Sequence, residues 1–114
     1  MRFRLCALFV ALVFVSTLAA GCRPKPSPGP AAWPSDEWFD RLAQCETGGN
    51  WGAPGPTYVG GLGLWHGNWG DNGGYEFAPS ANLASREQQI IVGRRIALRY
   101  GPNAWGCTKA IGVP

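Results

Sequence analysis

The sequence predicts a small α+β domain with two main helices, a short glycine-rich β-hairpin and one disulfide. Three observations lead to this prediction. Apolar side chains recur at helical spacing over residues 35–47 and again over 86–100, and a glycine follows each stretch. The segment between them, residues 48–74, is too rich in glycine for a long helix. Two cysteines, Cys45 and Cys107, remain in the domain, and an even pair in an exported protein is most simply a disulfide.

The first 21 residues have the pattern of an export signal. A basic run, Met1 to Arg4, precedes the apolar run from Leu5 to Leu18, and small residues follow. An uncleaved membrane anchor is the alternative, but the apolar run is shorter than the roughly 20 residues that span a bilayer. We therefore expect residues 1–21 to be a lipoprotein-type signal peptide that is removed on export.

Cys22 directly follows the string L-A-A-G, which resembles a lipobox. At a lipobox the cysteine receives diacylglycerol and becomes the new N-terminus. This interpretation predicts a protein attached through Cys22 to the outer face of the plasma membrane. Ordinary signal cleavage nearby, with secretion into the cell wall, is the alternative, because Ala19 stands where a lipobox usually has leucine.

The folded domain is expected to span residues 33–114, after a proline-rich linker at 22–32. The linker carries four prolines, which favour an extended, semi-rigid spacer. Four of the ten basic residues precede residue 33, whereas all seven acidic residues follow it, so six positive charges face seven negative ones in the domain. The net charge of +3 therefore belongs to the signal and the linker, which argues against a nucleic-acid partner.

The first helix is expected to begin after Ser35 and to end at Gly48. Ser35 is a good capping residue, and the two acids that follow it complement the positive end of the helix dipole. A pair of glycines at 48–49 is a stop signal. Apolar residues from Phe39 onward share one face, and Glu46 is the last-turn member of that face.

The glycine-rich segment is expected to form a small hairpin and to carry exposed or packed aromatic rings. Its strands would be residues 57–59 and 62–64, joined by the two glycines at 60–61. Trp65, Trp69 and Tyr75 alternate with glycines, which would let the rings approach a ligand closely. Packing in the core is the alternative for each ring.

The second helix is expected to cover residues 86–100. Ser85 and Gln88 have the spacing of a capping box, and Gly101-Pro102 ends the pattern. Three arginines would occupy a solvated sector of this helix: Arg94, Arg95 and Arg99. The expected buried face consists of Ile90, Gly93, Ala97 and Tyr100, widened by Val92 and Ile96.

Glu46 stands where a carboxyl group would tend to stay neutral. The negative end of the helix dipole and desolvation by apolar neighbours both favour the protonated acid. A protonated glutamate in an aromatic cleft is what cleavage of a glycosidic bond requires, because the departing oxygen must receive a proton. A solvated glutamate without a role is the alternative.

The chain contains four characteristic strings in this order: "WFDRLAQCETGGNW", "GGLGLW", "LASREQQIIVGRRI" and "AWGC". Together they resemble the catalytic domain of the resuscitation-promoting factors, the transglycosylase-like family of actinobacteria and their phages. The resemblance covers about Trp38 to Cys107. It implies a lysozyme-like fold with a Cys45–Cys107 disulfide. It also implies cleavage of the β-1,4 bond between N-acetylmuramic acid and N-acetylglucosamine in peptidoglycan, with Glu46 as the catalytic acid.

The substrate contacts expected around Glu46 are Asn50, Trp51, Tyr58, Trp65, Trp69 and Gln88. The chain departs from the family where a glutamine is usual, at Gly63, and where an aromatic residue is usual, at Leu64. Because a hydrogen-bonding side chain of the cleft is missing at Gly63, two other classes of function stay open. One is a wall-binding module without catalysis, and the other is a secreted signalling protein.

A single acid favours a lytic transglycosylase, although hydrolysis with water remains open. Asp71 is better explained as a turn residue, and Glu76 does not stand out. We expect no metal, because the single His66 and the scattered cysteines do not form a ligand cluster, and no cofactor. The expected protein is a monomer that acts on the glycan strands of peptidoglycan.

Overall fold

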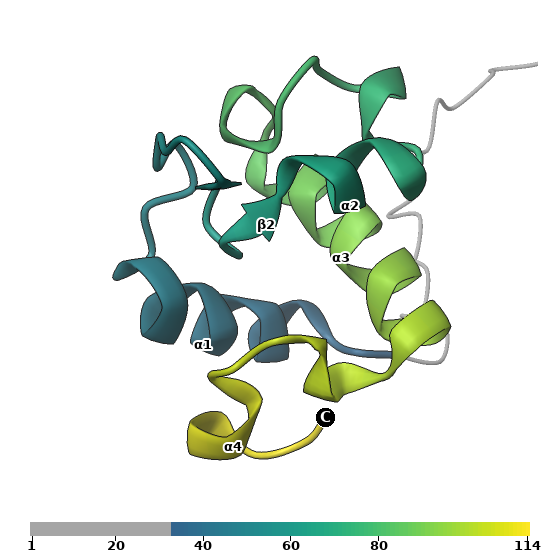
Figure 1. The fold of residues 1–114 in the computed structure, drawn as a ribbon. Helices are drawn as coiled ribbons and strands as arrows, with labels where there is room; N and C mark the ends of the chain where they lie inside the picture. The colour runs from purple at the N-terminus through teal and green to yellow at the C-terminus, as the bar shows by residue number, and fades with distance from the viewer. Residues whose placement is uncertain (1–32) are drawn as a thin grey trace, which may run out of the picture.

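The computed structural model describes residues 33–114 and confirms the predicted α+β class (Figure 1). The signal peptide, the linker and the lipidation expected at Cys22 lie outside the described residues. The elements are α1 (Asp36–Thr47), β1 (Tyr58–Val59), β2 (Leu64–Trp65), α2 (His66–Asp71), α3 (Arg86–Tyr100) and α4 (Thr108–Ile111), with 3₁₀ turns at Gly74–Glu76, Ala81–Leu83 and Pro102–Ala104. Across residues 33–114, no helix has the length and apolarity needed to cross a membrane.

Both predicted main helices are confirmed, together with their caps. The Ser35 hydroxyl accepts a hydrogen bond from the Trp38 amide (3.2 Å) at the start of α1. Gly48 ends this helix in the left-handed conformation, with φ of 67°. At the start of α3, Ser85 and Gln88 form the reciprocal capping box, with bonds of 3.2 and 2.9 Å. Local capping chemistry therefore sets three of these boundaries.

The hairpin is confirmed, but its second strand begins later than predicted. Tyr58 pairs with Trp65 and Val59 with Leu64, so the connection runs over residues 60–63. Leu62, expected in the strand, instead turns into the core and is fully buried. Gly60 and Gly63 both have positive φ, 78° and 59°, which only glycine adopts readily, so the longer turn is favoured.

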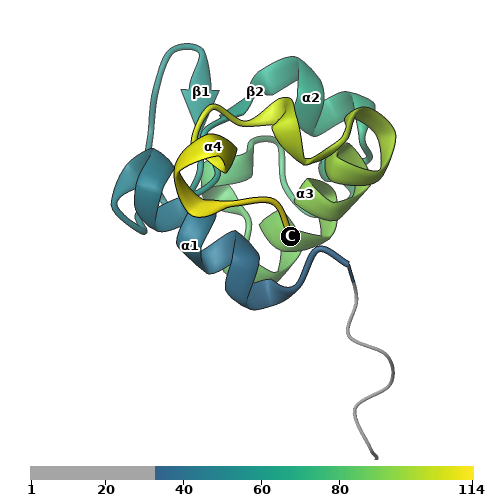
Figure 2. The same cartoon turned by 90° about the horizontal axis from the view of Figure 1, so that it is seen from below.

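The core lies between α1, the hairpin, α2, α3 and the C-terminal segment. Trp38, Phe39 and Trp105 pack edge to face, with ring centroids 5.1 to 6.0 Å apart. The indole N–H of Trp38 also donates to the Gly112 carbonyl (2.8 Å), which joins the end of the chain to α1. In both ribbon views α4 lies against α1 (Figure 1, Figure 2).

Helix α3 buries the face that the sequence predicts, with one exception. The predicted members from Ile90 to Ala97 are buried, whereas Tyr100 is 52% exposed because the helix ends there. Gly93 is required for the close approach of α3 to the core. A Cβ at this position would lie 2.8 Å from the Leu62 side chain and 2.9 Å from the Phe39 ring.

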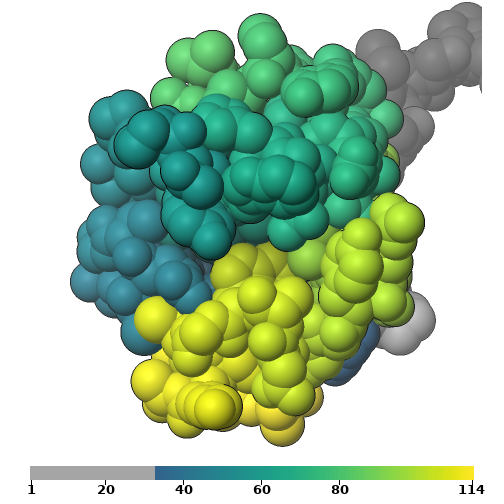
Figure 3. Space-filling view, viewed as in Figure 1, coloured from purple at the N-terminus to yellow at the C-terminus, as the bar shows by residue number. Residues whose placement is uncertain are grey.

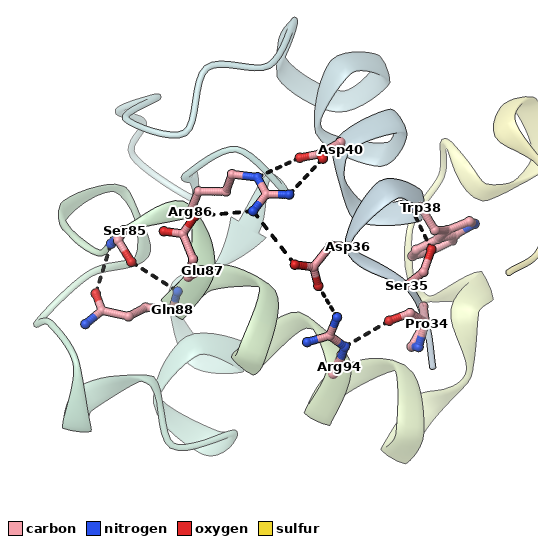
Figure 4. A network of polar contacts seen from close by, with 10 residues as sticks. All are labelled: Pro34, Ser35, Asp36, Trp38, Asp40, Ser85, Arg86, Glu87, Gln88 and Arg94. Atoms are coloured by element: carbon pink, nitrogen blue, oxygen red, sulfur yellow. Dashed lines mark hydrogen bonds and ion pairs between the residues drawn. The ribbon is translucent and has the colours of Figure 1, made fainter. Parts of the chain in front are cut away.

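A polar network joins α3 to the start of α1 (Figure 4). The Arg86 guanidinium donates two hydrogen bonds to Asp40, of 2.8 and 2.7 Å, and Arg94 pairs with Asp36 and donates to the Pro34 carbonyl. The hydrogen bond with Arg86 holds the pKa of Asp40 below its usual value, and the same bond raises the pKa of Arg86. The arginine sector is therefore partly paired, rather than only solvated as predicted.

Candidate active site

Glu46 lies half-buried in the last turn of α1, where a second segment reaches it. Its Oε1 accepts a hydrogen bond from the Cys107 amide (3.1 Å). Cys107 forms the predicted disulfide with Cys45, the residue next to Glu46. The covalent bridge thus holds the amide donor beside the carboxyl group, so one oxygen of Glu46 is fixed as an acceptor.

The other carboxyl oxygen faces the turn of the hairpin. Glu46 Oε2 lies 3.9 Å from the position that a Cβ on Gly63 would occupy. The left-handed backbone of Gly63 and its missing side chain keep this side of the carboxyl group open. Oε2 is therefore the oxygen of Glu46 that faces the hairpin turn and the pocket.

Glu46 lines a pocket of about 490 Å³, within the usual range for small-molecule sites. One wall consists of residues 53–54 and the hairpin residues Tyr58, Gly60 and Gly63, and the other consists of residues 104–106. In the space-filling view the teal loop and hairpin face the yellow C-terminal segment across a depression (Figure 3). Among the residues that line this pocket, Glu46 is the one with an acidic side chain.

Gln89 supports the hairpin side of the site from beneath. Its side chain is fully buried, and its Oε1 accepts from the Gly61 amide (2.9 Å). Its Nε2 donates to the carbonyls of Trp51 (2.8 Å) and Ala84 (3.0 Å). One glutamine on α3 therefore joins the loop after α1, the turn of the hairpin and the segment before α3.

Thr47 provides a second joint at the end of α1. Its hydroxyl lies 2.8 Å from the Gly61 carbonyl, to which it donates, and 3.2 Å from the Ala43 carbonyl within the helix. The ring of Trp51 packs on Gly61, because a Cβ there would lie 2.5 Å from its Cε3. These contacts fix the hairpin turn relative to Glu46.

Four of the six expected substrate contacts lie in the hairpin or in the loop before it. Tyr58 lines the pocket with Glu46, and Trp65 stands opposite Tyr58 on the exposed face of the hairpin. Asn50 is exposed and accepts a hydrogen bond from the Gly52 amide (3.1 Å), a turn contact within its own loop. Trp51 is half-buried and supports the turn, as described above.

The structure does not bring Trp69 or Gln88 into the pocket. Trp69 is fully buried, and its indole N–H donates to the Ala78 carbonyl (2.8 Å), so it belongs to the core. Gln88 caps α3 through Ser85. Its neighbour Gln89 makes the contacts beneath the site, and helical spacing could have found it, because Gln89 precedes Val92, Gly93 and Ile96 on the buried face.

No three His, Cys, Asp or Glu side chains group as metal ligands within the part of the chain that the structure describes. The two acids that the sequence analysis weighed and set aside do not line the pocket: Asp71 ends α2 and is exposed, and Glu76 forms an ion pair with Arg95 (3.0 Å). The site is thus a one-acid pocket between a glycine-rich hairpin and a disulfide-tethered segment.

Residues 32–108 match the family model described as "Transglycosylase-like domain". The chain belongs to this transglycosylase-like family. Its domain is 54% identical over 70 residues to resuscitation-promoting factor RpfA of Mycobacterium tuberculosis, across 60% of this chain and 17% of that protein. It is 44% identical over 101 residues to resuscitation-promoting factor Rpf1 of Corynebacterium glutamicum, across 86% of this chain and 52% of the relative.

The transglycosylase-like domain also matches resuscitation-promoting factor RpfB of Mycolicibacterium smegmatis, with 38% identity over 98 residues, 84% of this chain and 26% of that protein. The chain therefore spans between 17% and 52% of the lengths of these three relatives. The resemblance on which the sequence prediction rested is confirmed at the level of the family.

Proposed function

We propose that this transglycosylase-like domain cleaves peptidoglycan at the β-1,4 bond between N-acetylmuramic acid and N-acetylglucosamine, with Glu46 as the general acid. The observation that carries the proposal is that the two carboxyl oxygens of Glu46 have different surroundings. Oε1 accepts from the Cys107 amide, while Oε2 is open toward Gly63 and the pocket. Family membership supports the substrate class.

The bond is cleaved in two steps. In the first, Glu46 Oε2 gives its proton to the departing glycosidic oxygen as the bond to the muramyl C1 breaks. In the second, the Glu46 carboxylate takes the proton of the muramyl 6-hydroxyl, whose oxygen bonds to C1 and closes a 1,6-anhydro ring. Glu46 is then protonated again, and no net charge remains. The Cys107 amide can donate to Oε1 in both states, so the carboxyl group need not reorient between the steps.

Two features favour ring closure over attack by water. Glu46 is the acid that lines the pocket, so a second carboxylate to hold a hydrolytic water is not supplied there. The muramyl 6-hydroxyl is part of the substrate itself and needs no further binding site. The products separate the two reactions, because the anhydro product is lighter than the hydrolysis product by one water.

The substitution Glu46→Gln tests the catalytic assignment. The glutamine oxygen can still accept from the Cys107 amide, so the fold should persist, but no proton can be delivered. We expect digestion of purified peptidoglycan to fall by about 10²–10⁴-fold, with binding to insoluble wall retained. Glu76→Gln is the matched control, because Glu76 pairs with Arg95 outside the pocket. Normal digestion by Glu46→Gln would overturn the assignment.

The second candidate function is a wall-binding module, and Gly63 is the observation that favours it. Without a side chain at Gly63, no hydrogen-bonding group from this position helps to hold the sugar beside Glu46. A wild-type protein that sediments with insoluble peptidoglycan but releases no soluble products would establish this reading. A protein that neither binds nor cleaves would instead favour a signalling role.

The proposed location is the outer side of the plasma membrane, with the proline-rich linker holding the domain near the wall. The disulfide between Cys45 and Cys107 fits an oxidising compartment. Lipidation at Cys22 is tested by mass: the exported protein should carry diacylglycerol, and Cys22→Ala should release it from membranes. Recovery of unmodified protein in the medium would instead favour ordinary signal cleavage.

A further inference from the structure

Three exposed aromatic rings form a row that begins in the pocket and leaves it. Tyr58 lines the pocket and is 64% exposed. Trp65 lies directly opposite Tyr58 in the hairpin and is 50% exposed, whereas the alternate pair, Val59 and Leu64, is buried. Directly paired residues project to the same side of a sheet, with Cβ atoms about 4.5–5.5 Å apart. The first two rings therefore share one open surface.

Helix α2 continues the row. The indole of Trp65 lies on Gly67, whose missing Cβ would collide with the six-membered ring. The ring of Tyr75, which is 66% exposed, lies on Gly70 in the same way, with its Cε2 2.6 Å from the position of a Cβ. Because Gly67 and Gly70 are three residues apart, they share one face of the helix.

Gly67 and Gly70 make α2 less stable than alanines would, and the close approach of the two rings explains why these positions lack a side chain. Each glycine in a helix is less favourable than alanine by about 0.8–1.0 kcal/mol. Here both glycines leave room for an aromatic ring directly against the helix, and each ring is still at least half exposed. A ring that is held against the helix and remains exposed is suited to contact a ligand, since little side-chain freedom is lost on binding.

Resting on the proposed function, we propose that Trp65 and Tyr75 extend the sugar-binding surface beyond Tyr58, so that the domain holds a glycan polymer along α2. Pyranose rings present C–H faces that pack on aromatic rings and direct their hydroxyls toward water. A narrow row of single rings, continuous with the pocket, matches a linear chain of such sugars. Trp65 and Tyr75 would both bind sugars that lie beyond the two sugars joined by the cleaved bond.

The test measures binding in a Glu46→Gln background, so that cleavage does not consume the probe. The probes are insoluble peptidoglycan and a single soluble disaccharide of N-acetylglucosamine and N-acetylmuramic acid. We expect Trp65→Ala and Tyr75→Ala each to weaken binding to the polymer roughly threefold to tenfold, with the disaccharide bound as before. Tyr100→Ala is the matched control, because this tyrosine is 52% exposed at the end of α3.

A second variant guards against a loss of fold. Gly67→Ala keeps the indole of Trp65 but displaces it from the helix, and it should reproduce the loss for the polymer while favouring the helix itself. Polymer binding unchanged in all three variants, or an equal loss for disaccharide and polymer, would overturn the inference. Cleavage of peptidoglycan by the protein with its native Glu46 is measured separately. Absence of cleavage there would contradict the proposed function, whereas the binding measurements test the aromatic row.

Discussion

Gln89 offers a prediction whose magnitude follows from its contacts. In Gln89→Leu the side chain keeps an apolar shape of similar size, but three hydrogen bonds are lost. The bonds to the Gly61 amide and the Ala84 carbonyl are fully buried, so both partners would be left without hydrogen bonds. Each such group costs about 1–3 kcal/mol, which predicts a loss of about 2–6 kcal/mol in the free energy of unfolding.

This loss is large for a small domain. At about 0.05–0.15 kcal/mol per residue, the folded part is stable by about 4–12 kcal/mol. Urea unfolding, followed by tryptophan fluorescence in the oxidised protein, measures the change. We also expect wall digestion to fall, because Gln89 holds the loop at Trp51 and the hairpin turn at Gly61.

The adjacent glutamine is the matched control. Gln88 makes one exposed capping bond to the Ser85 amide, so Gln88→Ala should cost only about 0.5–1.5 kcal/mol. A free energy of unfolding for Gln89→Leu within about 1 kcal/mol of the wild-type value would contradict the cost assigned to the buried hydrogen bonds. Equal losses for Gln89→Leu and Gln88→Ala would contradict it as well.

Three further predictions concern the frame of the site. Cys107→Ser should lower the free energy of unfolding by about 2–5 kcal/mol and reduce digestion, measured by urea unfolding and product release. Gly93→Ala should destabilise although alanine favours helices, since a Cβ 2.9 Å from the Phe39 ring overpacks the core by about 1–3 kcal/mol; greater stability would contradict this. The folded pKa of Asp40 is lowered by its hydrogen bond with Arg86, so this pair stabilises the protein above the unfolded pKa of about 3.9 and loses its effect as pH falls through the folded pKa. Asp40→Asn should therefore cost below about 1 kcal/mol at pH 7, and progressively less as the pH falls below the unfolded value, as thermal unfolding over an acidic pH series would reveal.

The two main helices could be predicted closely because their signals are local. Ser35, Ser85 and Gln88 cap the helices through bonds that span only three residues, and Gly48 ends α1 through its own backbone conformation. Such contacts are present in the sequence itself, within one turn of the helix. The strong candidate Glu46 was predictable for the same reason, as the last member of an apolar stripe.

The glycine-rich segment was predicted less well. The sequence indicated a hairpin but not where its second strand begins, and α2 was not predicted, because a six-residue helix with two glycines has little local preference. The buried residue that anchors this helix is Trp69, whose indole N–H donates to the Ala78 carbonyl. In the sequence Trp69 has the same glycine-rich surroundings as Trp65 and Tyr75. Only the structure shows that Trp69 is buried and the other two rings are exposed.

The sequence by itself determined the class of fold, both main helices, the disulfide and the acid at the end of α1. The tertiary structure decided that Gln89, rather than Gln88, supports the site, and that the Cys107 amide holds Oε1 of Glu46. These contacts join residues 28 and 61 positions apart. Helical periodicity and capping act over a few residues, whereas the orientation of a carboxyl group in a pocket depends on which distant backbone reaches it.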